Sequence, residues 1–379
     1  MSLALMLGGG GARGAYQAGV LKGIARRCPD LRFPIKTGIS AGAVNTIHLA
    51  AHPGTLGAAA EDLVKLWVGL TPEQVFRIGT APLLWNVFRW AARLASGGIG
   101  SGREPMRGMM DTQPLREFLT RSLMPGPDGA IEGIARNIES GRLNAVALSA
   151  TSYTTGQSMT WVQARNPALW QRPQRRSAAA PLTVEHVMAS SALPMVFPSV
   201  RVGAEWYGDG GIRLTAPLSP AIHLGATRIL NISTRKQRTT AEAGAPQTAG
   251  YPPPAQVLGA LYNAIFLDLI EEDVVRAKAV NRLLEALPDD RRNSLRIVDV
   301  MVIRPSRDLG RLAGEFEARL PGIMKYLTRG LGTKETASPD LLSLILFQED
   351  YLRRLIEIGE EDGWNHAEGL QAFTEMGGR

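Results

Sequence analysis

The sequence predicts an α/β fold: a three-layer α/β/α sandwich with a mostly parallel central sheet, followed by a helical C-terminal extension. Two observations lead to this fold class. Short apolar runs alternate with helix-like stretches through the first half of the chain, and glycine-rich turns directly follow two of the apolar runs. Such alternation is typical of parallel strands joined by helical crossovers. Ligands of these folds bind at the carboxyl ends of the strands, where both glycine-rich turns are expected.

The first fifty residues contain four of these elements. Leu3–Leu7 is an apolar run that suits a buried strand, and a helix is expected from about Ala15 to Arg26. A second strand runs into Gly38, and the next helix covers Ala43 to about Ala51. Because strand and helix alternate with short connections, neighbouring strands are expected to run parallel, with helices on both faces of the sheet.

The later elements follow from local patterns. We expect a strand at Leu143–Ser149 with a hairpin partner at Met159–Gln163, and a helix from Thr183, as N-cap, to Ser191. The remaining expectations are, in order, a loop at 171–180, a strand at 228–234, a mobile loop at about 235–256, a long helix at about 255–287, a strand at 296–303 and helices in the tail. This organisation predicts one domain at 1–305, with its motifs within about 3–235, and a helical C-terminal extension at 306–379.

Size and composition limit the class of protein. The chain has 379 residues, of which 45% are hydrophobic and 20% charged, which suits a globular protein with a sizeable core. The single cysteine, Cys28, excludes an intramolecular disulfide framework and is compatible with a reducing compartment. The first seven residues lack the basic region of a secretory signal, and no uncharged stretch reaches the length of a membrane span. We therefore expect a cytoplasmic protein.

The net charge predicts attraction to anionic surfaces. The formal charge is +7 and the pI about 9.7, which favours either phospholipid headgroups or nucleic acid. The chain has no basic stripe interleaved with aromatic residues, so we expect no nucleic-acid partner. Residues 83–96 form an amphipathic pattern with Arg89 and Arg93 on one face, followed by the glycine-rich connector 97–102. This segment suits a lid or a helix that contacts an anionic membrane, or else an ordinary surface helix.

A serine stands at the turn between the second expected strand and the helix after it. Gly38, Ser40 and Gly42 form the pattern G-x-S-x-G. A sharp turn of this kind holds a serine hydroxyl out at the top of a sheet, and the flanking glycines allow a strained backbone. The pattern makes Ser40 a candidate nucleophile, although five residues alone are also found in structural turns.

A second glycine-rich turn follows the first strand and opens the first helix. It contains G-x-G-x-x-G at Gly9, Gly11 and Gly14. Backbone N–H groups at the start of a helix bind either the pyrophosphate of a dinucleotide or a developing oxyanion. Dinucleotide binding requires an acidic residue at the end of the second strand, but residues 34–40 contain no carboxylate. The oxyanion interpretation is therefore favoured.

The base that would activate Ser40 is less obvious. Histidine is the usual base, yet none of the five histidines, His48, His52, His186, His223 and His366, lies in a recognisable catalytic pattern. The alternative is Asp209, which precedes Gly210 and Gly211 at the end of a short strand that begins near Val200. An exposed aspartate is a weak base, with a pKa of about 3.9, but burial raises its pKa. A Ser–Asp dyad is possible if the carboxylate lies beside Ser40.

Taken together, the motifs GGGGARG, GISAG and DGG resemble those of the patatin-like phospholipases. The phrase Ala189-Ser190-Ser191-Ala192-Leu193-Pro194, with Phe197-Pro198, is similar to the segment that this family carries before its aspartate. The resemblance covers about residues 3–235. One departure is Gly8, where the family commonly has an aspartate.

The resemblance implies a mechanism and a substrate class. Ser40 would be the nucleophile and Asp209 its base, with an oxyanion hole from the backbone of Gly9, Gly10 and Gly11 and with Arg13 beside it. The family hydrolyses acyl esters of phospholipids and neutral lipids. The resemblance implies no metal or organic cofactor, although some relatives use calcium through a separate domain.

We therefore expect a serine acyl-ester hydrolase of lipids, of the phospholipase A, lysophospholipase or lipid esterase type. A lipid acyltransferase differs only in the group that accepts the acyl chain. A membrane-surface lipid-binding protein with little activity and a dinucleotide-dependent oxidoreductase are the alternatives from other classes.

Overall fold

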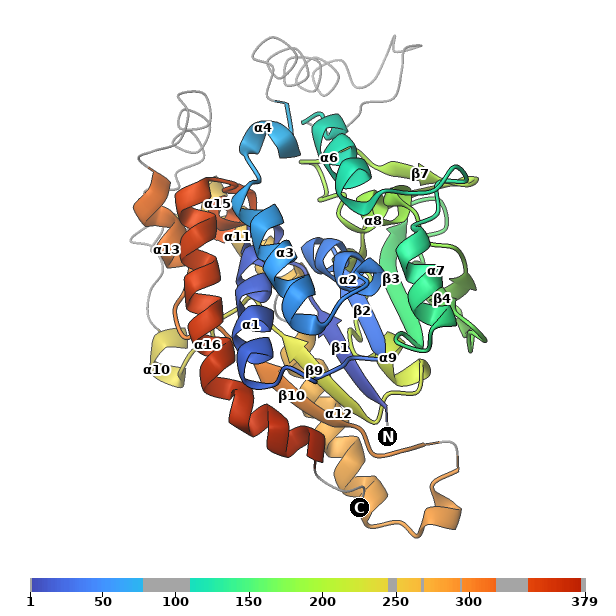
Figure 1. Ribbon diagram of the computed structural model, residues 1–379. Helices are drawn as coiled ribbons and strands as arrows, with labels where there is room; N and C mark the ends of the chain where they lie inside the picture. Colours follow the sequence, from blue (N-terminus) through green and yellow to red (C-terminus); the bar gives the residue numbers. More distant parts are fainter. Residues whose placement is uncertain are drawn as a thin grey trace.

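A computed structural model confirms the expected fold class: a central, mostly parallel sheet lies between helical layers, and further helices follow at the C-terminus (Figure 1). The structure describes residues 2–77, 110–244, 251–266, 269–293, 295–317 and 340–375. The basic amphipathic segment at 83–96 and its connector at 97–102 lie outside these residues. No helix within the described ranges is long and apolar enough to cross a membrane.

The first four elements agree closely with the sequence prediction. Strand β1 covers Leu3–Leu7, helix α1 Gly14–Arg27, strand β2 Ile35–Ile39 and helix α2 Ala41–Ala51. The helices that follow on this side are α3 (Leu56–Val68), α4 (Pro72–Val75), α6 (Gln113–Leu123) and α7 (Glu132–Glu139).

Five parallel strands form the centre of the sheet. Their order is β10 (Asp299–Ile303), β9 (Arg228–Ile232), β1, β2 and β3 (Ala145–Ser152). The expected hairpin is confirmed, because β4 (Ser158–Ala164) pairs antiparallel with β3. The far end of β3 also pairs antiparallel with β8 (Glu205–Asp209), which in turn pairs with β7 (Val200–Val202). All five central strands therefore direct their carboxyl ends to one edge.

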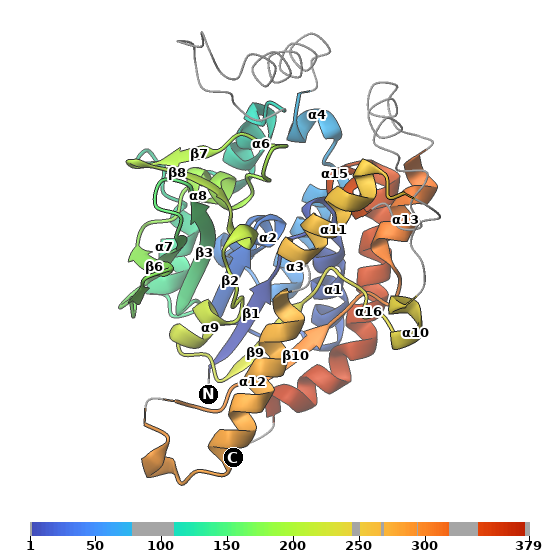
Figure 2. The same cartoon turned by 180° about the vertical axis from the view of Figure 1, so that it is seen from behind.

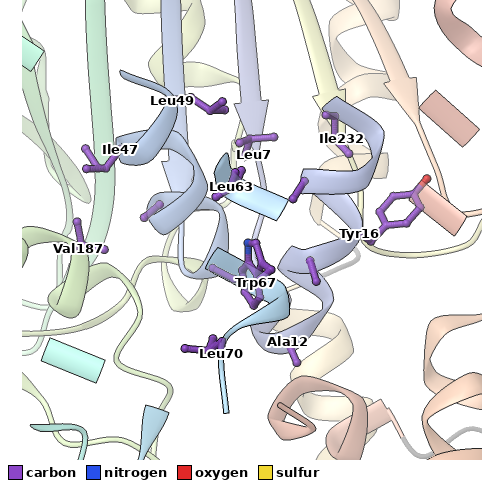
Figure 3. Packing of buried hydrophobic residues seen from close by; sticks show 14 of the residues in the cluster. Leu7, Ala12, Tyr16, Ile47, Leu49, Leu63, Trp67, Leu70, Val187 and Ile232 are labelled. Carbon is purple, nitrogen blue, oxygen red and sulfur yellow. The ribbon is translucent and has the colours of Figure 1, made fainter. Parts of the chain in front are cut away.

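The two faces of the sheet bury separate sets of side chains. Residues Leu5 and Leu7 of β1 point to one face, where α1, α2 and α3 cover them (Figures 1 and 3). Ala4 and Met6 point to the other face, which is covered by α9 (Ser219–His223) and α12 (Leu269–Glu285), visible from behind (Figure 2). This alternation of side chains in β1 explains why an uninterrupted apolar run forms a strand that is buried on both sides.

Two expectations from local sequence were wrong. The segment 171–180 was expected to be a loop, but it forms β5 (Gln171–Arg172) and β6 (Arg175–Ala179), because β6 pairs with β4 and extends the sheet. The arginines of this segment hid the strands from sequence analysis, since charged side chains are typical of strands near the edge of a sheet. The expected loop at 235–256 includes one short helix, α10 (Thr240–Ala243), capped by Thr239, and its mobility stays a prediction. The long helix at 255–287 is two helices, α11 (Pro254–Phe266) and α12, with 267–268 outside the described residues.

The C-terminal helices pack on the same core as α1. They are α13 (Leu309–Phe316), α15 (Asp340–Ile345) and α16 (Glu349–Glu375). Helix α16 lies along α1 on the outer side of the sheet in both views (Figures 1 and 2). Leu352 and Leu355 of α16 are fully buried in the cluster that includes Leu7 and Tyr16. A domain boundary near residue 305 stays a prediction from the sequence.

Candidate active site

Ser40 lies in a strained turn between β2 and α2. Its φ of 57° and ψ of −129° fall outside the regions that most residues adopt, and it is the N-cap of α2. Gly38 is the fourth residue of β2, and Gly42 lies in the first turn of α2. A Cβ atom at Gly42 would overlap the carbonyl oxygen of Leu7, so only glycine fits there. The strand, turn and helix expected around Ser40 are therefore present.

The end of helix α8 (Val184–Ser190) fixes the backbone of Ser40 on both sides. The amide of Ser40 donates a hydrogen bond to Ser190 Oγ at 3.0 Å, and Ser191 Oγ donates to the carbonyl oxygen of Ser40 at 3.0 Å. Ser190 Oγ itself donates to the carbonyl oxygen of Ser149 in β3 at 2.7 Å. The turn is thus tied both to α8 and to the neighbouring strand. As expected, Thr183 caps α8.

Asp209 ends β8 beside the same segment. Its amide donates to the carbonyl oxygen of Ala192 at 3.0 Å, and its own carbonyl accepts from Thr151 Oγ1 at 2.8 Å. The segment 190–192 therefore contacts the backbones of both Ser40 and Asp209. Gly210 and Gly211 follow in a 3₁₀ turn, and the amide of Gly211 donates to Asp209 Oδ1 at 2.9 Å.

The carboxyl group of Asp209 is fully buried, and this burial dominates its electrostatics. Burial raises its pKa from 3.8 to about 7, while the side chain of Ser40 and the amide of Gly211 act in the opposite direction. The Ser40 hydroxyl is therefore near enough to favour the charged carboxylate. It does not form a hydrogen bond of good geometry, because Asp209 Oδ2 is buried without a partner among the described residues. Loose contacts of this kind are common in catalytic pairs before substrate binds.

The glycine loop between β1 and α1 leaves two backbone amides without a hydrogen bond among the described residues, and its Gly11 lines the same cavity as Ser40. Gly10 and Gly11 have φ angles of 151° and 54°, and their amides have no hydrogen-bond partner among the residues that the structure describes. Thr234 Oγ1 holds the carbonyl oxygen of Gly9 at 2.8 Å, and Gly14 begins α1. Unpaired amides at the start of a helix attract an anionic oxygen.

Arg13 directs its guanidinium away from these amides and into the protein. It is 2% exposed, and its Nε donates to Ser343 Oγ at 2.8 Å. Its Nη2 pairs with Asp340 Oδ1 at 2.5 Å, and its Nη1 lies 3.5 Å from the carbonyl oxygen of Thr234. The side chain thus joins the glycine loop to the C-terminal helices.

A narrow apolar cavity reaches Ser40 from the face of the sheet that α2 and α3 cover. The volume of this cavity is about 70 Å³. Ser40 lines it together with Gly11 and Ala41, and most of the wall is aliphatic or aromatic, as in Leu63, Trp67, Leu115, Phe118, Leu119, Leu193, Phe197, Leu344 and Phe347. Such a cavity suits a hydrocarbon chain whose polar end reaches Ser40.

His48, which lies in no recognisable catalytic pattern of the sequence, lines this cavity. His48 lies two helical turns beyond Ser40, or roughly 12 Å along α2 at 1.5 Å per residue. Its Nε2 contacts the carbonyl oxygen of Ala59, and burial lowers its pKa to about 4. His186 packs at the edge of Trp161 and binds Thr183, in agreement with a structural role. The position of His48 does not suit a base for Ser40.

The sequence did not indicate the contributions of the C-terminal segment. Asp340, Ser343, Leu344 and Phe347 contact the glycine loop or line the cavity, yet their sequence contains no pattern that predicts this. Within the described ranges, no group of three or more acidic, histidine or cysteine side chains could hold a metal ion.

Comparison with known proteins places the motif-bearing part of the chain in one family. A family model described as patatin-like phospholipase matches residues 5–222. No curated protein matches the chain significantly. Three solved structures are similar to the chain. VipD from Legionella pneumophila is 15% identical with a TM-score of 0.39, and the match covers 94% of this chain and 67% of VipD. Human GIVD cytosolic phospholipase A2 is 10% identical with a TM-score of 0.43, and the match covers 98% of this chain and 62% of the human chain; its complex with methyl gamma-linolenyl fluorophosphonate is 12% identical with a TM-score of 0.45, covering 98% and 58%. The chain therefore spans about three fifths of the length of the two human structures.

Proposed function

Because this chain belongs to the patatin-like phospholipase family, we propose that it is a serine acyl-ester hydrolase of lipids that uses Ser40 and Asp209 as a catalytic dyad. One observation carries the proposal most directly. The buried carboxyl of Asp209 interacts with the Ser40 side chain, and Ser40 lines a mostly apolar cavity. A carboxyl with a pKa near 7 can accept a proton at neutral pH and release it again.

In the first half of the reaction, Ser40 Oγ attacks the ester carbonyl carbon and Asp209 accepts the hydroxyl proton. The carbonyl oxygen becomes negatively charged, and the amides of Gly10 and Gly11 stabilise it, with Gly9 completing the loop. The C–O bond to the alcohol then breaks, and Asp209 returns the proton to the leaving oxygen. The products are a free alcohol or lysolipid and an acyl-Ser40 ester.

Water completes the cycle in the second half. Asp209 accepts a proton from water, the hydroxide oxygen attacks the acyl carbon, and the same amides stabilise the second oxyanion. Collapse of this intermediate releases the fatty acid, and the proton on Asp209 returns to Ser40 Oγ. The apolar wall of the cavity holds the acyl chain throughout and excludes bulk water from it.

Labelling with a fluorophosphonate tests the dyad. We expect the probe to modify Ser40 in the full-length protein, Ser40→Ala to abolish labelling, and Asp209→Asn to slow labelling at least about 100-fold, because the general base is lost. Asp62→Asn is the matched control, since Asp62 is a half-exposed carboxylate on α3 that pairs with Lys65 and His52. This control should label at the wild-type rate. Two results would rule out the dyad: a folded wild-type protein that does not react with the probe, or an Asp209→Asn variant that reacts at the wild-type rate.

A further inference from the structure

The C-terminal helix α15 contacts the glycine loop directly. The carbonyl oxygen of Leu344 occupies the space that a Cβ atom at Gly11 would need, so the two backbones touch. Leu344 also lines the apolar cavity. Gly11 therefore packs against a residue more than 300 positions later in the chain, beyond the part that the family model matches.

An ion pair holds α15 at this place. Asp340 Oδ1 accepts from Arg13 Nη2 at 2.5 Å, and Asp340 Oδ2 accepts from Asn263 Nδ2 of α11 at 2.7 Å. Ser343 Oγ accepts from Arg13 Nε at 2.8 Å. The side chains of Arg13 and Asp340 are only 3% and 13% exposed. Water therefore screens this ion pair only weakly, and each charged group is stabilised mainly by the other rather than by solvent.

We propose that Asp340 is a positioning residue for the hydrolase reaction, which acts through Arg13 to hold the amides of Gly10 and Gly11 in place. The proposal rests on the proposed function of the loop as the oxyanion site. Arg13 ends the 3₁₀ turn that starts at Gly11, so a shift of its guanidinium moves the same short turn that carries the amides. A displacement of about 1 Å at such a site can cost about 100-fold in rate.

Kinetics on a soluble short-chain ester test this role. Asp340→Asn should lower kcat about 10- to 100-fold while KM changes less than about 3-fold, because the oxyanion forms only after the substrate is bound. Asp340→Glu should restore part of kcat, since it keeps the charge. Combining Asp340→Asn with Arg13→Met should add little to the loss caused by Arg13→Met alone, because both act through one contact.

Glu360→Gln is the matched control. Glu360 of α16 pairs with Lys22 and Arg26, so it also joins α1 to the C-terminal helices, but at the opposite end of α1. Loss of this ion pair should leave kcat unchanged. Equal losses of kcat in Glu360→Gln and Asp340→Asn, at equal melting temperatures, would show a general effect of helix packing and overturn the proposal.

Hydrogen exchange provides a readout that does not depend on activity. In Asp340→Asn, the amides of Arg13 and Gly14, which donate hydrogen bonds back into the glycine loop, should exchange at least about 10-fold faster than in wild type, whereas Glu360→Gln should leave them unchanged. If hydrogen exchange in Asp340→Asn is the same as in wild type, the proposal is overturned, whatever the activity of the variant. If Asp340→Asn exchanges faster but the wild-type protein does not react with a fluorophosphonate, the contact is supported and only the proposed chemistry is refuted.

Discussion

In the reaction that we propose, a single carboxyl group decides the pH dependence. Burial raises the pKa of Asp209 to about 7, and in that proposal Asp209 must be charged to accept the Ser40 proton. Below this pKa the carboxyl is protonated and inactive, so the rate should rise with pH and level off above it. The nearby phenols of Tyr153 and Tyr262 are neutral in this range, because burial and Asp209 itself raise their pKa values.

We therefore expect the labelling rate of Ser40 to fall about tenfold per pH unit below about pH 7 and to be constant above about pH 8. The measurement is the rate of fluorophosphonate labelling between pH 5 and 9. His48 cannot produce this limb, since its pKa of about 4 leaves it neutral throughout. A flat profile from pH 5 to 9 would contradict the assignment of Asp209 as base.

Arg13 illustrates what sequence comparison cannot give at the scale of a residue. The resemblance placed Arg13 beside the oxyanion site, and its backbone does lie in the glycine loop. The direction of its side chain depends on Asp340 and Ser343, which follow in the chain more than 300 residues later. No local pattern around Arg13 encodes these partners.

Two helices make an unusually close contact between the start and the end of the chain. A Cβ atom at Gly363 of α16 would overlap the carbonyl oxygen of Val20 in α1, and one at Gly359 would overlap that of Tyr16. The phenol of Tyr16 donates to Asp362 at 3.0 Å across this contact, and both side chains are buried. Close approach thus allows a buried hydrogen bond that larger side chains would prevent.

Gly363→Ala should destabilise the protein by about 1–3 kcal/mol, because forced separation of the helices outweighs the gain in helix propensity of up to about 1 kcal/mol. Gly369→Ala on the same helix is the control. Gly369 is exposed, and a methyl group there would only reach ordinary contact with Met301. This variant should be more stable by about 0.5–1 kcal/mol. Urea unfolding measures both, and a stabilised Gly363→Ala would contradict the packing argument.

On the scale of the whole molecule, the C-terminal helices belong to the core that supports the site. Tyr351, Leu352 and Leu355 of α16 are fully buried, and Phe347 stacks on Trp67 in the cavity wall with ring centroids 6.5 Å apart. The sequence divides the chain at about residue 305 because its motifs end well before the tail. The charge of +7 and the segment at 83–96 still leave two interpretations from the sequence, a helix that contacts an anionic membrane or an ordinary surface helix.

A truncated chain decides whether residues 1–305 form a separate domain. We expect this fragment to lose cooperative thermal unfolding and fluorophosphonate labelling, because removal of α13, α15 and α16 exposes the apolar face of α1. A chain that ends at residue 375 is the control and should melt and label like wild type. A 1–305 fragment that melts cooperatively and labels at Ser40 would establish the division that the sequence suggests.

The sequence by itself determined the fold class, the first four elements and the motif positions. These depend on short-range properties: the uninterrupted apolar run of β1, the G-x-S-x-G pattern around Ser40 and the glycines before α1. Strand β6, which lies between β4 and the short edge strand β5, was not predicted, because its pairing with β4 outweighs its arginine-rich composition.

Only the tertiary structure decided which distant groups complete the site. It brought Asp209 to Ser40 through the segment 190–192, and Asp340 to Arg13. It also supplied Leu344 and Phe347 to the cavity wall. These contacts arise when the parallel strands align their carboxyl ends and α16 packs on α1. The motif at Asp209 indicated one of them, whereas the local sequence around Asp340, Leu344 and Phe347 contains no pattern that indicates the others.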